Sequence, residues 1–280
     1  MRARSARGGA QGGWAVWVLY LAAVVSGGAI VARALSPALD ETPRLAAASV
    51  LAYGCFGAAV GWLLGRISPP PRLPATTRWL AFLWGAFAAA GFAILANTAV
   101  RDRLAADGNP DGWQQWAPFI EEPLKNLGIA VVLLLATTRI RGALDGLVVG
   151  SLVGLGFEVV ENIAQSINNA VADFPVGQRD NLGSLATDVL HEVVRRSWTG
   201  HIVITGVAGF GIAYLMTARD SSPLRKWAIA GTLVATAFLA HVLWNSHRFG
   251  IFYVVGQFAV LVLFVLLVRH GRAREGRGAT

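Results

Sequence analysis

The chain has few charged residues and almost no cysteine or lysine. Only 14% of its 280 residues are charged, whereas 55% are hydrophobic. This balance is far from that of a soluble globular domain and is typical of a polytopic membrane protein. The single cysteine, Cys55, excludes an intramolecular disulfide and a thiolate metal cluster. Only two of the 24 basic residues, Lys125 and Lys226, are lysines, so Lys125, which lies inside an apolar segment, is a candidate functional residue.

Apolar runs of membrane-spanning length recur along the chain. About 20 apolar residues in a helix are enough to cross the hydrocarbon core of a bilayer. Eight such runs can be placed, and we predict an all-α bundle of about eight transmembrane helices. The runs lie near residues 14–33, 45–65, 79–99, 117–137, 142–163, 198–217, 227–246 and 251–268.

The basic residues are distributed unevenly between the two sides of such a bundle. If the N-terminus is cytoplasmic, 15 positive charges fall inside and eight outside, while only Asp220 and Glu275 among the acidic residues lie clearly inside. Both termini in the cytoplasm therefore satisfy the positive-inside tendency. The basic residues behind the net charge of +8 are distributed as expected for a membrane protein. The lipid bilayer rather than nucleic acid is therefore the predicted partner of these charges.

Two segments admit a second interpretation. The basic N-terminus and the apolar run after it resemble a signal peptide, but the run exceeds the ~7–15 residues of a secretory apolar region, which favours a retained helix. Residues 165–196 are polar and are broken at 173–177, with apolar residues at helical spacing in the second half. That half is either an amphipathic helix at the membrane interface or a surface loop.

The fourth predicted span begins with the string EEPLKN. Glu121 and Lys125 are four residues apart and share a helix face, so they can form an ion pair, while Glu122 points about 100° away. Pro123 either starts a helix, with the glutamates at its positive end, or kinks one. The alternative is a solvated cluster at the start of a helix.

The fifth span contains the string GFEVVEN. Phe157, Glu158 and Glu161 lie on one side of the helix, and Asn162 follows. Two acids on one face need a partner inside a membrane. Solvation at the end of the helix is the other explanation.

The sixth and seventh spans each contribute a histidine. His201 lies just inside one boundary of its span, and His241 shares a helix face with Asn245 four residues later. A lone histidine at the position of His201 is more often structural than a ligand, and His241 with Asn245, taken alone, is also a weak signal.

The direction of each span brings these four sets of residues to one depth. Spans four and six carry their polar residues near their starts and run inward, whereas spans five and seven carry theirs near their ends and run outward. Charged groups in a bilayer are costly, so groups that converge on one depth are predicted to build one site near the extracytoplasmic face.

Two imidazoles with several carboxylates support either of two chemistries that activate water. One is a Zn²⁺ site with an open position, and the other is a metal-free acid/base array. In the metal interpretation His201, His241 and Glu161 are ligands, Glu122 takes the proton of water, and Asn245 stabilises the oxyanion of the tetrahedral intermediate. Hydrolysis of an amide is the natural reaction.

The motifs resemble those of a known family. EExxK at Glu121, FExxEN at Phe157, an Arg-preceded His201 in a glycine-rich span and HxxWN at His241 are similar in order and context to the PrsW-type intramembrane proteases. These belong to the larger group of CAAX prenyl endopeptidases and bacteriocin-processing proteins. That group commonly has EExxxR and FxxxH, so Lys125 and Glu161 favour the PrsW branch. The resemblance covers about residues 117–268.

The resemblance implies an activity and a location. A PrsW-like protease clips a membrane-anchored regulatory protein, such as an anti-sigma factor, on its extracytoplasmic side in the bacterial plasma membrane. We predict a three-helix membrane segment over residues 1–111 and a five-helix catalytic domain over residues 112–280. The predicted catalytic residues are Glu121, Glu122, Lys125, Glu158 and Asn245, and the predicted metal ligands are Glu161, His201 and His241.

Two other classes of function use the same residue types. A secondary transporter or ion channel holds intramembrane Glu, Lys and His as an ion relay, although no inverted repeat is detectable and the acids lie near one surface. A catalytically inactive relative binds a membrane peptide in the same cavity.

Overall fold

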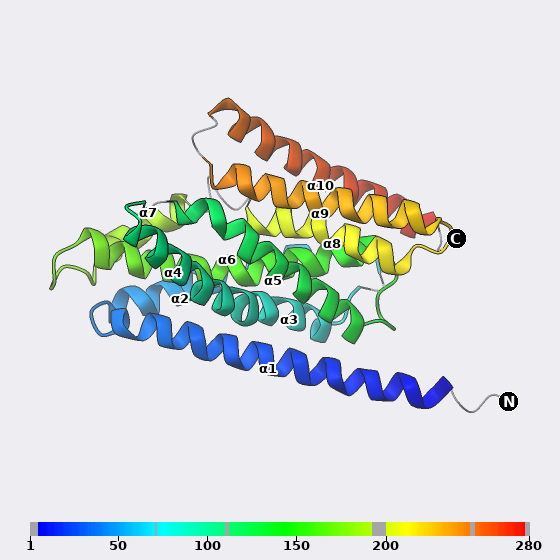
Figure 1. Cartoon of the computed structure of the whole chain (residues 1–280), viewed down its shortest axis with the longest axis horizontal. Helices are drawn as coiled ribbons and strands as arrows, with labels where there is room; N and C mark the ends of the chain where they lie inside the picture. The colour runs from blue at the N-terminus through cyan, green and yellow to red at the C-terminus, as the bar shows by residue number, and fades with distance from the viewer. Residues whose placement is uncertain (1–4, 71, 110–111, 192–199, 247–249, 278–280) are drawn as a thin grey trace.

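Every regular element in the described part of the chain is helical (Figure 1). The computed structural model describes residues 5–70, 72–109, 112–191, 200–246 and 250–277. The elements are α1 (Ser5–Leu39), α2 (Pro43–Leu64), α3 (Ala75–Leu83), the π-helical turn η1 (Trp84–Ala89), α4 (Ala90–Ala106), α5 (Trp113–Leu135), α6 (Ala143–Asp173), α7 (Leu182–His191), α8 (His201–Thr217), α9 (Pro223–Trp244) and α10 (Ile251–Arg277).

Six helices in the described residues are long and apolar enough to cross a membrane. They are α1, α2, the continuous helix formed by α3, η1 and α4, and then α6, α9 and α10. The all-helical class is thereby confirmed. Helices α5 and α8 occupy the two other predicted positions: α5 has 23 residues but carries three charged side chains, and α8 has only 17 residues. That these two also cross the membrane, and which way the chain is oriented, stay predictions.

Helix α6 is the centre of the bundle. In its most apolar window 94% of the residues are buried, against 11% in α10. Figure 1 shows α1 along one side of the bundle and α9 and α10 along the other. A polar residue in this window of α6 is therefore surrounded by protein, whereas the outer helices present their apolar side chains to the surroundings of the bundle, as expected for lipid contact.

Close packing of α6 against α8 depends on glycines. A Cβ atom added at Gly150 would overlap the carbonyl oxygen of Thr205, and one added at Gly154 would overlap that of His201. Small residues four apart let the backbones of membrane helices approach closely. The packing places the first residue of α8, His201, beside the part of α6 that carries Phe157 and Glu161.

The polar segment after α6 partly follows the sequence prediction. Helix α6 ends at Asp173, where a break was predicted, and α7 forms within the half for which an amphipathic helix and a surface loop were the two alternatives. The backbone N–H of Leu45 in the first turn of α2 donates to Asp180 (2.7 Å), which ties this segment to the α1–α2 turn. Arg195 and Arg196 lie outside the described residues.

The first turn of α6 holds a separate buried charge. The side chain of Asp145 is fully buried and accepts hydrogen bonds from the Arg141 guanidinium (3.0 and 3.1 Å) and the Ser68 hydroxyl (3.0 Å). The Arg141 backbone N–H donates a further bond (3.0 Å). Both carboxylate oxygens are thus paired, and the contacts connect α6 to the loop after α2.

Candidate active site

The ammonium group of Lys125 lies at the centre of a buried polar cluster. Its Nζ donates to Glu121 Oε2 (3.0 Å) and Glu122 Oε1 (3.2 Å) on its own helix, α5. A third contact of 3.0 Å reaches Nδ1 of His201 on α8, and Nζ lies 3.8 Å from the centre of the Phe157 ring on α6. Three protein contacts match the three N–H donors of an ammonium.

These contacts fix the tautomer of His201. An ammonium cannot accept a hydrogen bond, so Nδ1 of His201 has to be the acceptor, and the ring proton is on Nε2. Nε2 then donates to Glu161 Oε2 (2.9 Å). The side chain of Glu161 is 32% exposed, which makes it the outer member of the cluster.

His241 on α9 faces the same carboxylates. Its Nδ1 lies 2.8 Å from Glu122 Oε1, so an ionised Glu122 accepts a hydrogen bond from Nδ1 and leaves the lone pair on Nε2. Nε2 lies 3.7 Å from Glu121 Oε2, and the His241 ring lies 4.9 Å from that of His201. Four helices therefore meet here, as their shared depth predicted.

One participant was missed by the sequence interpretation. Asn97 on α4 donates from Nδ2 to Glu121 Oε1 (3.1 Å), while its Oδ1 is buried with no hydrogen-bond partner among the described residues. Glu122 Oε2 has none there either. The only available signal for Asn97 is an amide in an otherwise apolar turn of the third span, which carries no recognisable motif.

The structure also describes two further predicted site residues, Glu158 and Asn245. Glu158 is buried on α6, three residues before Glu161. Asn245 follows the end of α9, and its Nδ2 donates to the carbonyl oxygen of Gln114 (2.8 Å), which links α9 to the start of α5. The roles assigned to both residues stay predictions.

Similarity to known proteins identifies the family. Residues 73–269 match the PrsW family of intramembrane metalloproteases. The chain belongs to this family. It is therefore a membrane peptidase, and the match begins before the four motifs, at the loop preceding α3. Comparison with curated proteins and with solved structures gives no match.

The donor set of this PrsW-family chain suits a metal ion. Glu121, His201 and His241 are buried and each offers a ligand atom within 4.8 Å of the others. Two imidazoles and a carboxylate form a common ligand set of catalytic zinc sites. The carboxylate that the structure groups with both histidines is Glu121, whereas Glu161 bonds to His201.

Lys125 occupies atoms that a metal ion would need at this site. Its Nζ contacts Glu121 Oε2 and the only acceptor nitrogen of His201. An ammonium and a divalent cation cannot share one lone pair, and they repel each other at this distance. Coordination by His201 Nδ1 therefore requires Lys125 to give up that nitrogen.

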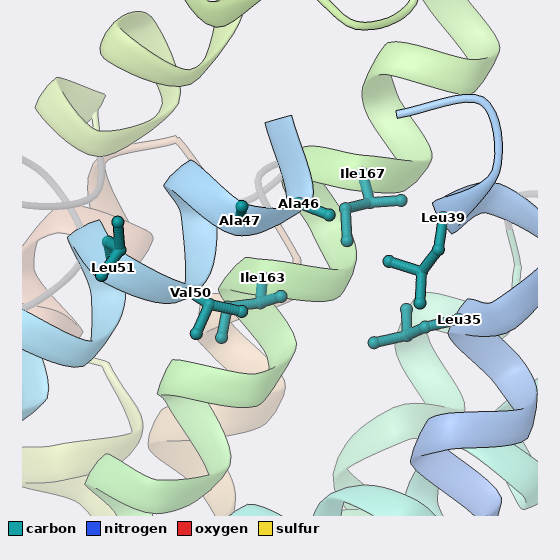
Figure 2. Close-up of a pocket in the computed structure, with 8 residues that line it drawn as sticks. All are labelled: Leu35, Leu39, Ala46, Ala47, Val50, Leu51, Ile163 and Ile167. Carbon is teal, nitrogen blue, oxygen red and sulfur yellow. The ribbon is translucent and has the colours of Figure 1, made fainter. Parts of the chain in front are cut away.

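Two cavities flank α6, and only one reaches the cluster. A cleft of about 380 Å³ between α4, α5 and α6 includes Glu121, Phe157 and Glu161 in its lining. Figure 2 shows the other, a groove of about 590 Å³ lined only by apolar side chains of α1, α2 and α6, such as Val50 and Ile163. The lining of the larger cavity has no group that can activate water, so of these two cavities only the smaller one is a candidate for the site.

Proposed function

We propose that the chain hydrolyses a peptide bond of a membrane-anchored protein at the Glu121–Glu122 cluster, near the extracytoplasmic face. The observation that carries this proposal is the meeting of two carboxylates and two histidines around a buried ammonium. Peptide hydrolysis needs a base for water, a cation for the oxyanion and an acid for the leaving amine.

Glu122 is the proposed general base. Its Oε1 is engaged by His241 and Lys125, whereas Oε2 is buried without a hydrogen-bond partner in the described part of the chain. A carboxylate oxygen in that condition is ready to take a proton from water and to return it to the leaving nitrogen. His241 holds the carboxylate in place through Nδ1.

Lys125 is the proposed electrostatic stabiliser. Its positive charge is fully buried, so it acts on a developing oxyanion more strongly than an exposed lysine would. Asn245, predicted from sequence for this role, already donates to Gln114. Lys125 is closer to the cluster and takes the role in this proposal.

Glu121, His201 and His241 would hold a metal ion, which we propose to be Zn²⁺. Such an ion supplies Lewis-acid polarisation and lowers the pKa of water. Glu161 would orient the ring of His201 by accepting from the nitrogen opposite the donor, as acidic residues do behind histidine ligands. Asn97 would orient Glu121 in the same way through Oε1.

The proposed location rests on charge and depth, and the proposed substrate rests on the resemblance to PrsW-type proteases. The predicted orientation places the cluster in the outer part of a bacterial plasma membrane. A single-span protein such as an anti-sigma factor presents a peptide bond at that depth.

The deciding experiment combines cleavage with metal analysis. The purified chain in proteoliposomes is incubated with single-span candidate substrates, and its bound metals are measured by mass spectrometry. We expect cleavage that a chelator removes and added zinc restores. Cleavage by a metal-free preparation that ignores the chelator would assign the reaction to the carboxylates alone. Proton flux driven by a pH gradient, without cleavage, would support transport instead.

A further inference from the structure

The apolar groove of Figure 2 lies where α1 ends and α2 begins. Its walls come from the last turns of α1, at Leu35 and Leu39, from the first turns of α2, and from the later half of α6, at Ile163 and Ile167. Helices α1 and α2 are both candidate membrane spans, and a short turn connects them. The groove therefore lies in the leaflet nearest to that turn, close to the membrane surface.

Water is a poor occupant of this groove. A buried water needs about two to four polar partners, whereas all 8 lining residues are apolar. Val50 and Leu51, on its α2 wall, are 54% and 69% exposed, so the groove opens to the surroundings of the bundle. Around a membrane-spanning bundle those surroundings are lipid chains and the helices of partner proteins.

The groove is too short to support a partner helix along its length. Its α2 lining runs from Ala46 to Leu51 and its α6 lining from Ile163 to Ile167, about 6–8 Å at ~1.5 Å per residue. A helix that spans the hydrocarbon core is about 30 Å long and would contact the groove over only about a quarter of that length. Helix interfaces in membranes also favour small residues, whereas Leu, Ile and Val make up most of this lining. A single flexible acyl chain suits such a short apolar groove better.

A basic side chain stands at the end of the groove nearest to the membrane surface. Arg44 lies in the first turn of α2, three residues before Ala47 and seven before Leu51, so the three share one helix face. Helical side chains point towards the N-terminus of their helix, which directs Arg44 away from the groove and towards the α1–α2 turn. Its side chain is 83% exposed, and its contact with Asp180 is long, at 3.8 Å. A guanidinium in this position suits a phosphate group.

Two acidic groups beside Arg44 already have partners. Asp180 Oδ1 accepts a hydrogen bond from the backbone N–H of Leu45 (2.7 Å). Glu41 forms an ion pair with Arg179. Arg44 thus keeps most of its surface available to an added anion, directly above an apolar groove.

We propose that the groove binds one acyl chain of a phospholipid, with the phosphate of that lipid at Arg44. The site goes beyond the proposed function, because it lies apart from the Glu121–Glu122 cluster and involves no peptide hydrolysis. Ile163 follows Glu161 by two residues on α6, so a lipid held here packs against the turn of α6 that carries the outer acid of the cluster.

Native mass spectrometry of the full chain in a mild detergent tests the inference. The probe is dioleoyl phosphatidylglycerol, titrated against the native chain and two matched pairs of variants. Arg44→Ala is paired with Arg103→Ala, because the Arg103 side chain is 78% exposed and also contacts an acid. Val50→Phe, which fills part of the groove, is paired with Val18→Phe, because both valines are 54% exposed and Val18 is outside the lining.

We expect one phosphatidylglycerol to bind the native chain more tightly than any further lipid. Arg44→Ala and Val50→Phe should each weaken that first binding about three- to tenfold, through loss of a charge near the headgroup and of apolar contact with the chain. Arg103→Ala and Val18→Phe should leave it unchanged. Dioleoylglycerol, which has the same acyl chains and no phosphate, should bind the native chain as weakly as phosphatidylglycerol binds the Arg44→Ala chain.

Photo-cross-linking gives a second measurement on the native chain in proteoliposomes. With a phosphatidylglycerol that carries a diazirine on one acyl chain, we expect adducts concentrated on residues 46–51. Adducts spread evenly over the outer helices would overturn the inference.

Equal binding of dioleoylglycerol and phosphatidylglycerol, or equal weakening by all four variants, would overturn it as well. Cross-links from this face to a second copy of the chain would assign the groove to self-association and would also overturn it. None of these measurements requires cleavage. A lipid-filled groove in a chain that cleaves nothing would therefore support this inference and remove the protease proposal alone.

Discussion

Buried charges lie at the start of α6 and beside its middle, and the two sets differ in how completely they are paired. At its start, both oxygens of Asp145 are paired with Arg141 and Ser68. Beside the middle of α6, the cluster around Lys125 includes Glu122 Oε2 without a hydrogen-bond partner among the described residues. A fully paired buried charge holds segments together, whereas an unpaired oxygen is available for a reaction. The comparison assigns architecture to the first set and chemistry to the second.

The largest expected effect is that of Glu122→Gln. Removing the proposed base should lower cleavage by about 10²- to 10⁴-fold, because the amide cannot take a proton from water. Thermal unfolding in detergent should change little, since the amide has nearly the shape of the carboxylate. Undiminished cleavage would remove Glu122 from the mechanism and contradict the assignment of chemistry to its unpaired oxygen.

Asp145→Ala should lower stability and leave cleavage nearly unchanged, the opposite of the result expected for Glu122→Gln. Removing this carboxylate from the partly exposed Arg141 guanidinium (31% exposed) and from its other donors should cost about 1–3 kcal/mol of unfolding free energy, while cleavage per folded molecule stays near that of the native chain. Ser68→Ala, which removes one neutral donor, is the control and should cost about 1 kcal/mol. Denaturant unfolding and cleavage rates, measured on the same samples, separate the two readouts. A catalytic defect at native stability would place this charge in the chemistry.

Lys125→Met tests whether the ammonium and a metal ion compete for the same atoms of the cluster. Removal of the ammonium frees His201 Nδ1 and Glu121 Oε2, so the affinity for Zn²⁺ should rise about tenfold, equivalent to ~1.4 kcal/mol. Cleavage should fall, because the cation near the oxyanion is lost. Lys226→Met, the change at the only other lysine, is the control. Calorimetric titration gives the affinity, and a value unchanged by Lys125→Met would mean that lysine and metal do not compete.

The smallest effect is expected where neither charge set is touched. Val50→Phe partly fills the apolar groove of Figure 2 and should shift stability by no more than about 0.5 kcal/mol. Cleavage should not change, because the groove and the cleft lie on different faces of α6. Strong loss of cleavage in this variant would show that the substrate approaches through the groove.

The helices and the meeting of the polar residues were predictable from sequence. Apolar length defines the spans, and chain direction gives the depth of each charged residue without any knowledge of packing. The carboxylate facing both imidazoles was not predictable, because it depends on the rotation of α5 and α6 about their axes. Sequence spacing placed Glu121 beside Lys125 correctly, yet it could not place Glu121 beside His241 on a distant helix.

Asn97 and Asp145 were beyond sequence reasoning for a different reason. Asn97 lies near the end of the third predicted apolar run and Asp145 near the start of the fifth, where solvation is the ordinary outcome. Only the packing of other helices around them makes one a partner of Glu121 and the other a buried ion-pair centre.

The glycine contacts between α6 and α8 constrain how the enzyme can open. Backbone lies against backbone at Gly150 and Gly154, so the two helices are packed too closely to admit even a methyl group at either position. The histidine on α8 and the acids on α6 therefore behave as parts of one rigid wall. We therefore expect any movement that admits a substrate to occur in α4 and the start of α5, and this movement would set the turnover rate if admission is the slow step.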